Sequence, residues 1–274
     1  KIASTSPGMP QQHRPSQLYN GMIYPLLHLN ITGATWYQGE SNAIGQGAAE
    51  DYAVLLPAMI ESWRESWDIP AMPFMIVQLA NWDPGDSNWD FPGVREVQRL
   101  THESMDHTGL AVITDIGDSK DIHPRNKHDV GDRLARWALA DVYKRWDVVK
   151  AGPMPRSIFW ADDVVRVNFE TYGSPIAHPA HGKRAAIGES ISGFEIADEE
   201  GTWWAATAKV ASPRVVAVDV PADVETPMAV RYAWAMDPVS ANLFNVEGLP
   251  ATPFAANRQS PGATIGDAVS RAYD

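Results

Sequence analysis

The sequence contains no cysteine, and this absence excludes a disulfide framework, a thiolate nucleophile and any metal site that needs a cysteine ligand. Its longest apolar runs fall far short of the ~20 residues that a helix needs to cross a bilayer, so we expect no membrane insertion. Basic residues are also scarce: 22 Lys and Arg stand against 34 Asp and Glu, for a net charge of −12. Without a basic stripe to neutralise phosphates, we expect no nucleic-acid partner.

The chain does have enough apolar residues to form a large core. It has 274 residues, of which 45% are hydrophobic and 20% are charged, which excludes general disorder. Such a length suits one large α/β domain or two ordinary ones. Residue 1 is lysine, and we expect the polypeptide to be a processed product or a segment of something longer.

The first half alternates between apolar strand patterns and helical patterns. Strands are predicted at 34–37, 74–79 and 110–114, and helices at 48–67, 93–105 and 126–146. This alternation predicts a parallel sheet with helices on both faces, which binds ligands beyond the carboxyl ends of its strands. Residues 16–29 form a further predicted helix with an apolar stripe and an expected kink at Pro25. No strand precedes that helix, so we expect at least one strand of the sheet to be absent from this chain.

The pattern changes after Gly152-Pro153. Short β-like segments separated by Gly, Pro and Asp turns follow one another, and no helix is predicted. We therefore expect an α/β domain over 1–150, a small all-β, sandwich-like domain over 151–257 and a poorly ordered tail over 258–274.

The loop after the third predicted strand offers a carboxylate two residues before an imidazole, Asp121 and His123. A hydrolase needs a base that titrates near neutral pH and a carboxylate that orients it, so this pair is a candidate catalytic site. The alternative is a solvated loop in which the aspartate caps a helix. His128 competes for the role of base, although it falls inside the predicted helix.

A second polar segment, Gln38-Gly39-Glu40-Ser41-Asn42, follows the first predicted strand. The Gly39 amide and the Gln38 or Asn42 side chain are donors of the kind that stabilise an oxyanion, and Glu40 would orient a neighbour. The alternative is a β–α turn in which Ser41 or Asn42 caps a helix. Ser41 lacks the second glycine of a Gly-x-Ser-x-Gly elbow, so we do not predict it as the nucleophile.

Two other features have both a functional and a structural interpretation. Tryptophan is abundant, with 11 residues, and three of them, which we predict in loops beside Asp, Asn or Gly, could stack on sugars or simply pack: Trp82, Trp89 and Trp160. His178 and His181 could suggest a metal, but Pro179 disfavours a helix and no third ligand is near, so we predict no metal and no cofactor.

Several strings resemble the sialate O-acetylesterase family, which belongs to the SGNH hydrolase superfamily of carbohydrate esterases. In the first half they are Leu18-Tyr19-Asn20-Gly21-Met22-Ile23, Trp36-Tyr37-Gln38-Gly39-Glu40-Ser41-Asn42-Ala43 and Asp121-Ile122-His123-Pro124-Arg125-Asn126-Lys127. In the second half they are Gly193-Phe194-Glu195-Ile196-Ala197, Val230-Arg231-Tyr232-Ala233-Trp234 and Asn242-Leu243-Phe244-Asn245-Val246-Glu247-Gly248-Leu249-Pro250. The resemblance runs from about Pro15 to Phe254.

This resemblance implies a flavodoxin-like, three-layer esterase domain that removes acetyl groups from sugars, such as sialic acid or xylan-type sugars, by a Ser-His-Asp mechanism. His123 would be the general base and Asp121 its orienting carboxylate. Gln38 and Gly39 would belong to the oxyanion-hole block, with Glu40 as a supporting acid. The implied location is secreted, periplasmic or lysosome-like.

The sequence departs from the family at two points. The family's nucleophile is the serine of a Gly-Gln-Ser-Asn motif at the end of the domain's first strand, and this motif occurs nowhere in the chain. We therefore expect the serine to come from an amino-terminal segment or a companion chain. The superfamily usually places its acid three residues before the histidine, where this chain has Lys120, so Asp118 remains an alternative to Asp121. The rival hypothesis is a non-catalytic carbohydrate-binding or scaffolding protein that has lost its nucleophile.

Overall fold

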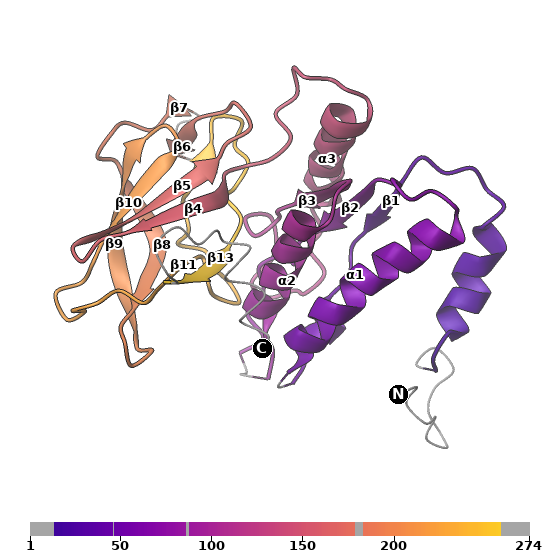
Figure 1. Cartoon of the computed structure of the whole chain (residues 1–274), viewed down its shortest axis with the longest axis horizontal. Helices are drawn as coiled ribbons and strands as arrows, with labels where there is room; N and C mark the ends of the chain where they lie inside the picture. The colour runs from indigo at the N-terminus through magenta and orange to yellow at the C-terminus, as the bar shows by residue number, and fades with distance from the viewer. Residues whose placement is uncertain (1–13, 46, 86–87, 179–182, 259–274) are drawn as a thin grey trace.

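A computed structural model describes residues 14–45, 47–85, 88–178 and 183–258 (Figure 1). An α/β part is followed along the chain by a part built almost entirely of strands, which lies beside it in Figure 1. The chain leaves the last helical turn of the α/β part, η5 (Ala138–Val142), and enters the first strand of the β part at Met154. The predicted tail lies, apart from Arg258, outside the described residues.

The α/β part contains the predicted parallel sheet. Its strands are β1 (Ala34–Trp36), β2 (Phe74–Val77) and β3 (Thr108–Ala111), in the order β1-β2-β3. The helices are α1 (Ala48–Ser66), α2 (Phe91–Ser104) and α3 (Lys127–Trp137). The predicted order of strands and helices is confirmed, although β3 begins two residues before the predicted strand. Within the described residues β1 pairs with β2 alone, so its other edge carries no strand.

Alternating side chains of β2 face two layers of helices. The Phe74 ring lies 5.8 Å from the ring of Trp63 on α1, at a steep angle. On the opposite face, Met75 and Trp137 of α3 meet over Gly109, where an added Cβ would lie 2.5 Å from the Met75 sulfur and 2.8 Å from the Trp137 ring. The three-layer arrangement predicted from the sequence is therefore confirmed, with Gly109 required for the contact between α3 and the sheet.

The predicted helix over 16–29 differs from the structure. It forms a π-helical turn, η2 (Tyr19–Ile23), and a 3₁₀ turn, η3 (Tyr24–Leu26), with Pro25 in the second. Its predicted apolar stripe is exposed rather than buried: Met22 retains 64% of its accessible surface. The apolar periodicity is real, but in the described residues no layer covers this side of the segment.

The β part has one large antiparallel sheet and one small one. The large sheet has the strand order β13-β11-β8-β9-β10-β5-β4, and the small one β12-β6-β7. The strands are β4 (Met154–Trp160), β5 (Val164–Glu170), β6 (Ile176–His178), β7 (Lys183–Arg184), β8 (Ser190–Ala197), β9 (Trp203–Ser212), β10 (Val215–Asp219), β11 (Ala229–Tyr232), β12 (Phe244–Asn245) and β13 (Phe254–Asn257). Their inward side chains form one apolar core. Trp160, which we predicted in a loop, ends β4 and packs against this core.

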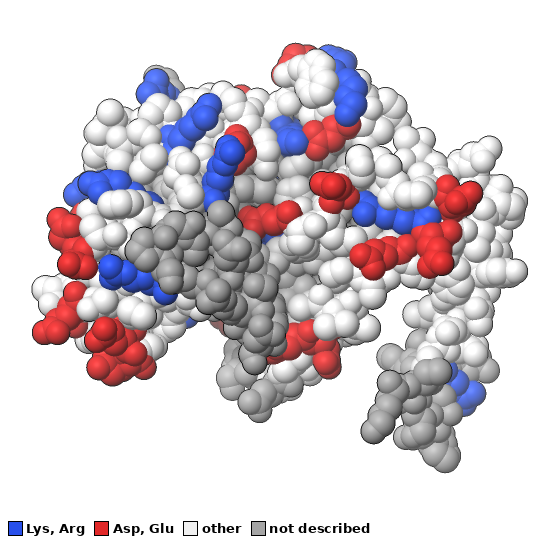
Figure 2. Space-filling view, in the orientation of Figure 1, with Lys and Arg blue, Asp and Glu red and all other residues white. Residues whose placement is uncertain are grey.

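None of the helices in the described part of the chain is long and apolar enough to span a bilayer. Figure 2 shows acidic and basic side chains interspersed over one face of the molecule, without a continuous band of Lys and Arg on that face.

Candidate functional site

Two polar loops leave the carboxyl ends of β1 and β3, and one contact brings them together. Lys127, at the start of α3, places its Nζ 3.3 Å from the Tyr37 hydroxyl and 4.4 Å from the centroid of the Tyr37 ring. Tyr37 directly precedes Gln38, and Lys127 lies four residues after His123. The segments that carry the two groups of predicted site residues are therefore neighbours at the same edge of the sheet, as the parallel topology requires.

Gln38 is held by hydrogen bonds on its side chain and its carbonyl. The Tyr52 hydroxyl donates to its Oε1 at 3.2 Å, and its Nε2 donates to Asn42 Oδ1 at 2.7 Å. The Gln38 carbonyl accepts a hydrogen bond from Gln98 Nε2 at 3.1 Å. Since Asn42 uses its Oδ1 to accept from Gln38, its Nδ2 group points elsewhere and can donate to a ligand.

Gly39 lies in a conformation and a space that exclude other residues. Its φ is +147°, and an added Cβ would lie 3.1 Å from Val94 and 3.3 Å from both Gln98 and Leu79. Among the described residues the Gly39 amide donates to no acceptor, although the Gly39 carbonyl accepts from the amide of Asn42 at 2.9 Å. A buried backbone N–H without a partner can donate to an oxyanion of a bound ester.

The residues after Gly39 form a short 3₁₀ helix, η4 (Glu40–Ala43), with Ser41 exposed to solvent. Burial and, to a smaller extent, the charge of Glu40 raise the pKa of Tyr37 to about 12. Burial likewise raises the pKa of Tyr52 to about 12, with a small further rise from Glu40. Both phenols therefore stay protonated at neutral pH, which keeps Tyr52 a donor to Gln38.

His123 and Asp121 adjoin each other in an exposed turn. The Asp121 Oδ1 accepts the His123 backbone N–H at 2.9 Å and lies 3.5 Å from the ring Nδ1, while 88% of the His123 side chain is exposed. The neighbouring Pro124 is buried, and Ile122 packs against the core, so the turn is anchored on both sides of the imidazole. Asp118, the alternative carboxylate, accepts instead from the Lys120 backbone N–H at 2.9 Å.

His128 is the competing imidazole, and it lies in the first turn of α3. Its side chain is 94% exposed, and its Nδ1 is 3.4 Å from Asp129. The hydrogen bond from Asn126, followed by that from His128, lowers the pKa of the Asp129 carboxyl. The Asn126 side chain caps the helix by accepting the Asp129 amide, so the His128 pair belongs to a helix terminus.

Trp82 and Trp89 lie in the loop between β2 and α2 and pack against each other. Their ring centroids are 5.0 Å apart in an edge-on arrangement, and Trp82 also lies 5.5 Å from Phe91. Both pack against the buried core of the α/β part, which favours the packing interpretation over an exposed sugar platform. His181 lies outside the described residues; among those described, no group of three or more His, Asp and Glu could hold a metal ion.

The sequence analysis missed two buried residues, Gln98 and Arg95, that support the strand ends at the candidate site. The fully buried Gln98 accepts the Leu79 amide at 3.0 Å and donates to the Gln38 carbonyl, which ties the ends of β1 and β2 together. The fully buried Arg95 donates to Leu79 and Ala80 of the α/β part and to Ala235 and Met236 of the β part, all at carbonyl oxygens and at 2.6–2.9 Å. Both are polar residues on a helix, a pattern that normally indicates exposure, so the sequence offered no signal for them.

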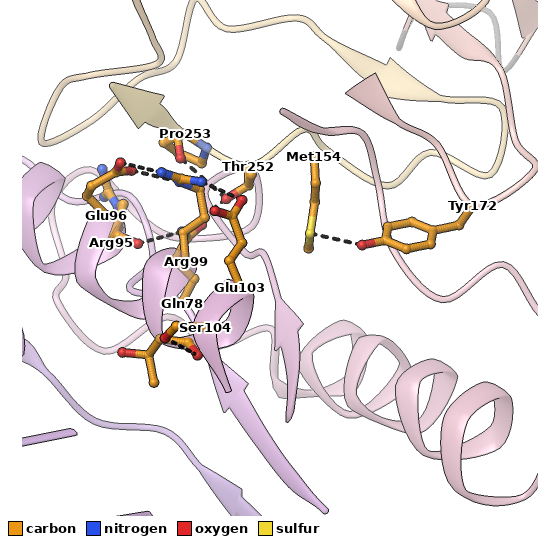
Figure 3. A network of polar contacts seen from close by, with 11 residues as sticks. Gln78, Arg95, Glu96, Arg99, Glu103, Ser104, Met154, Tyr172, Thr252 and Pro253 are labelled. Carbon is orange, nitrogen blue, oxygen red and sulfur yellow. Dashed lines mark hydrogen bonds and ion pairs between the residues drawn. The ribbon is translucent and has the colours of Figure 1, made fainter. Parts of the chain in front are cut away.

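Arg95 belongs to a polar layer between α2 and the β part (Figure 3). One turn further along α2, the buried Arg99 contacts Glu96 and Glu103 at 2.5 Å each. In the same layer, the Gln78 side chain of the α/β part donates to the Thr252 hydroxyl of the β part at 3.2 Å. The two parts are therefore joined by directional polar contacts next to the ends of the strands that carry the site.

Known proteins resemble this chain in sequence and in structure. The family model for carbohydrate esterases described as sialic acid-specific acetylesterases matches residues 3–140. Sialate O-acetylesterase of Mus musculus is 31% identical over 267 residues, which cover 89% of this chain and 47% of the mouse protein. The Homo sapiens protein of the same name is 30% identical over 92% of this chain and 51% of its own length.

A solved structure gives the same answer. The crystal structure of a carbohydrate acetylesterase from Xanthomonas citri matches with a TM-score of 0.82 and 35% identity, over 92% of this chain and 56% of that one. This chain thus spans about half the length of the relatives that it matches. The motifs, the three-layer fold and these matches agree: the chain belongs to the sialic acid-specific acetylesterase family of carbohydrate esterases.

Proposed function

We propose that this chain is part of an enzyme that hydrolyses O-acetyl esters on carbohydrates by a Ser-His-Asp mechanism, with the serine supplied by a segment outside this chain. The substrate would be an O-acetylated sugar such as sialic acid or a xylan-type sugar. The observation that most supports the proposal is the Lys127–Tyr37 contact, which joins the segment that follows the imidazole to the segment that precedes Gly39. The uncovered edge of β1 and the lack of a Gly-Gln-Ser-Asn motif in the sequence support an external serine.

In this mechanism His123 removes the proton from the serine hydroxyl as the serine oxygen attacks the acetyl carbonyl carbon. The carbonyl oxygen becomes an oxyanion, which accepts hydrogen bonds from the Gly39 amide and the Asn42 Nδ2 group. When the tetrahedral intermediate collapses, the bond to the sugar oxygen breaks and His123 gives its proton to that oxygen. Water, deprotonated by the same imidazole, then releases acetate and restores the serine.

Two features of the base loop support these roles. The high exposure of His123 leaves its ring accessible to a hydroxyl from another segment. Asp121 lies 3.5 Å from Nδ1, a separation that a bound substrate would shorten to a hydrogen bond. We assign Asp121 rather than Asp118 as the orienting carboxylate because the Asp121 Oδ1 lies 3.5 Å from the imidazole Nδ1, whereas the Asp118 Oδ1 accepts the backbone N–H of Lys120. Gln38 orients Asn42, and Glu40 supports the block electrostatically.

The test is hydrolysis of p-nitrophenyl acetate by the protein that includes the sequence upstream of Lys1, compared with this chain alone. We expect this chain alone to be inactive and His123→Ala in the longer protein to lose at least about 1000-fold in kcat/KM. His128→Ala is the matched control, because His128 is an equally exposed imidazole at 3.4 Å from a carboxylate, and it should keep full activity.

Near-wild-type activity of His123→Ala would overturn the proposal. Asp121→Asn and Asp118→Asn separate the two carboxylates, since only the orienting one should lower kcat strongly. A fluorophosphonate label on Ser41 would favour catalysis by this chain itself. Sugar binding by a longer protein that has no esterase activity would favour a carbohydrate-binding function instead.

A further inference from the structure

Asn81, just beyond β2, connects the β part to the loop that carries His123. Its Oδ1 accepts the Gly117 backbone N–H at 2.7 Å, and its Nδ2 donates to Asp237 Oδ1 at 2.8 Å. A backbone N–H can only donate and a carboxylate can only accept, so these partners fix which way the amide points. Asn81 is buried, and its side chain has one donor contact and one acceptor contact across three separate segments.

Two backbone hydrogen bonds join the same three segments as the Asn81 side chain. The Trp82 amide donates to the Met236 carbonyl at 3.3 Å, and the Asp83 amide donates to the Ser119 carbonyl at 3.1 Å. The turn 81–83 is therefore held between residues 236–237 of the β part on one side and residues 117–119 on the other. A shift of the β-part segment would move this turn, and the turn would move the loop.

The β-part segment, residues 233–237, is itself held by several hydrogen bonds. Arg95 donates to the carbonyls of Ala235 and Met236 at 2.6 and 2.8 Å. Ala233, which begins the segment, has a φ of +52°, an unusual conformation for alanine, and its amide donates to the Gly193 carbonyl at 2.9 Å. Such a conformation persists where the surrounding contacts determine it, which makes this segment a rigid support.

The contact between Asn81 and Gly117 leaves no free space. A Cβ at Gly117 would lie 2.3 Å from Asn81 Oδ1 and 2.4 Å from the Asn81 carbonyl oxygen. Beyond Gly117, the Asp121 amide donates to the Asp118 carbonyl at 3.2 Å, and the Asp121 carboxylate holds the His123 amide. Consecutive turns thus connect the Asn81 contact to the imidazole.

We propose that Asp237 is a positioning residue of the esterase, which acts through Asn81 to set the loop that places His123. The inference rests on the role proposed above for His123. It assigns a task in catalysis to the β part: Asp237 orients a buried amide of the α/β part, and that amide sets the position of the base.

An exchange of donor and acceptor tests this bridge in the active, longer protein. Asn81→Asp still accepts from Gly117 but meets Asp237 with a like charge, and we expect kcat to fall about 10- to 100-fold with little change in KM. Asp237→Asn retains an acceptor for Asn81, and the weaker bond should cost less than about threefold. In the double variant, the amide now at position 237 donates to the carboxylate now at position 81, so kcat should return to within about threefold of wild type.

A second measurement, which does not depend on enzyme activity, is hydrogen exchange of this chain alone. Hydrogen exchange at residues 117–123 should speed up in Asn81→Asp and recover in the double variant. The matched control is Asn245→Asp, because Asn245 is also buried and also bridges a carbonyl, that of Ala151, and an amide, that of Leu249. It should lower the melting temperature without changing kcat of the folded enzyme or exchange at 117–123.

The proposal is wrong if Asn81→Asp keeps wild-type kcat, or if the double variant is no better than Asn81→Asp. It is also wrong if Asn245→Asp reduces kcat as much as Asn81→Asp does, since both would then act through stability. These outcomes differ from failure of the proposed function, which would appear as full activity in His123→Ala.

Discussion

Helix α2 and the first helical segment, residues 17–26, reverse the usual relation between hydropathy and burial. α2 carries arginine, glutamate, glutamine and histidine, yet the side chains of Arg95, Gln98 and Arg99 are fully buried. The first segment carries leucine, methionine and isoleucine, yet Met22 is 64% exposed. Side-chain polarity alone therefore does not predict whether either helix is buried. The groups that surround each helix determine its burial.

The arginines of α2 show how a polar helix becomes a core element. Burial lowers the pKa of Arg95 to about 9 and outweighs the opposite effect of the Asp237 and Asp90 charges. The Arg95 guanidinium donates its hydrogen bonds to carbonyl oxygens. Burial would also lower the pKa of Arg99, but Glu96 and Glu103 outweigh it and raise that pKa above its usual value. Two neighbouring buried cations between α2 and the β part are thus stabilised in different ways: Arg95 by backbone carbonyl dipoles and Arg99 by paired carboxylates.

The largest effect should come from breaking the Arg95 contacts. Arg95→Met keeps an unbranched stem of similar shape but removes a donor from four carbonyls, and it leaves the two buried ones, those of Leu79 and Ala80, without a partner. We expect the free energy of unfolding of this chain to fall by about 4 kcal/mol, since each buried unsatisfied group costs about 1–3 kcal/mol and removal of the buried charge offsets part of the sum. Urea denaturation followed by tryptophan fluorescence measures it.

Arg136→Met is the control for loss of an arginine: Arg136 lies on α3 in a half-exposed pair with Asp132 at 2.7 Å. It should cost less than about 1 kcal/mol. If both variants lower the free energy of unfolding by the same small amount, the Arg95 contacts contribute little to stability. The contrast between α2 and an ordinary surface helix then disappears.

The next effect is a pH dependence that arises from α2. Burial, with smaller contributions from Lys150 and Arg99, lowers the pKa of His102 to about 4. Its Nδ1 lies 3.1 Å from the Thr108 hydroxyl, and its ring packs edge-on against Trp137. In the unfolded chain the imidazole has its ordinary pKa of 6.5, so between pH 6.5 and 4 the unfolded state binds a proton that the folded state does not.

The contribution of His102 is therefore complete above pH 6.5 and is lost as the pH falls towards 4, by about 3 kcal/mol in all. His102→Gln should remove this part of the pH dependence of the free energy of unfolding, whereas the exposed His128→Gln should leave it unchanged. The same slope in wild type and in His102→Gln between pH 6.5 and 4 would contradict the assignment.

Local patterns were enough to predict the layers of the fold. Apolar runs at 74–79 and 110–114, separated by helical periodicity, correctly indicated a buried parallel sheet. The exposure of the apolar stripe at 16–29 could not be predicted for a physical reason: periodicity reports which face of a helix is apolar but not whether anything packs on that face. The loop prediction for Trp160 is wrong because an aromatic residue next to Ala-Asp-Asp in sequence can still end a strand whose inner face is buried.

The candidate site could be proposed from the sequence only where its chemistry lies within a few residues. Gln38, Gly39, Asp121 and His123 form short polar segments at strand ends, and their positions follow from parallel topology. Asn81 and Asp237 are 156 residues apart, and neither has a local pattern that distinguishes it from a surface residue. Long-range polar contacts of this kind leave no periodic signal in a single sequence.

The smallest effect should come from the other half of the comparison, the exposed apolar face of the first segment. Met22→Gln in this chain should change the free energy of unfolding by less than about 0.5 kcal/mol, because water already covers most of the side chain. Leu56→Ala on α1, whose side chain is 1% exposed, is the opposite control and should cost about 2–5 kcal/mol. Urea denaturation measures both variants.

A loss above about 1 kcal/mol for Met22→Gln in this chain would mean that the face is covered in solution, since exposed substitutions normally cost less. The same substitution in a protein extended upstream of Lys1 sharpens the comparison, because burial of Met22 under added sequence would raise its cost to about 1.5–3 kcal/mol. An increase seen only in the longer protein would show that the apolar face of the first segment, unlike the polar face of α2, obtains its partners from outside this chain.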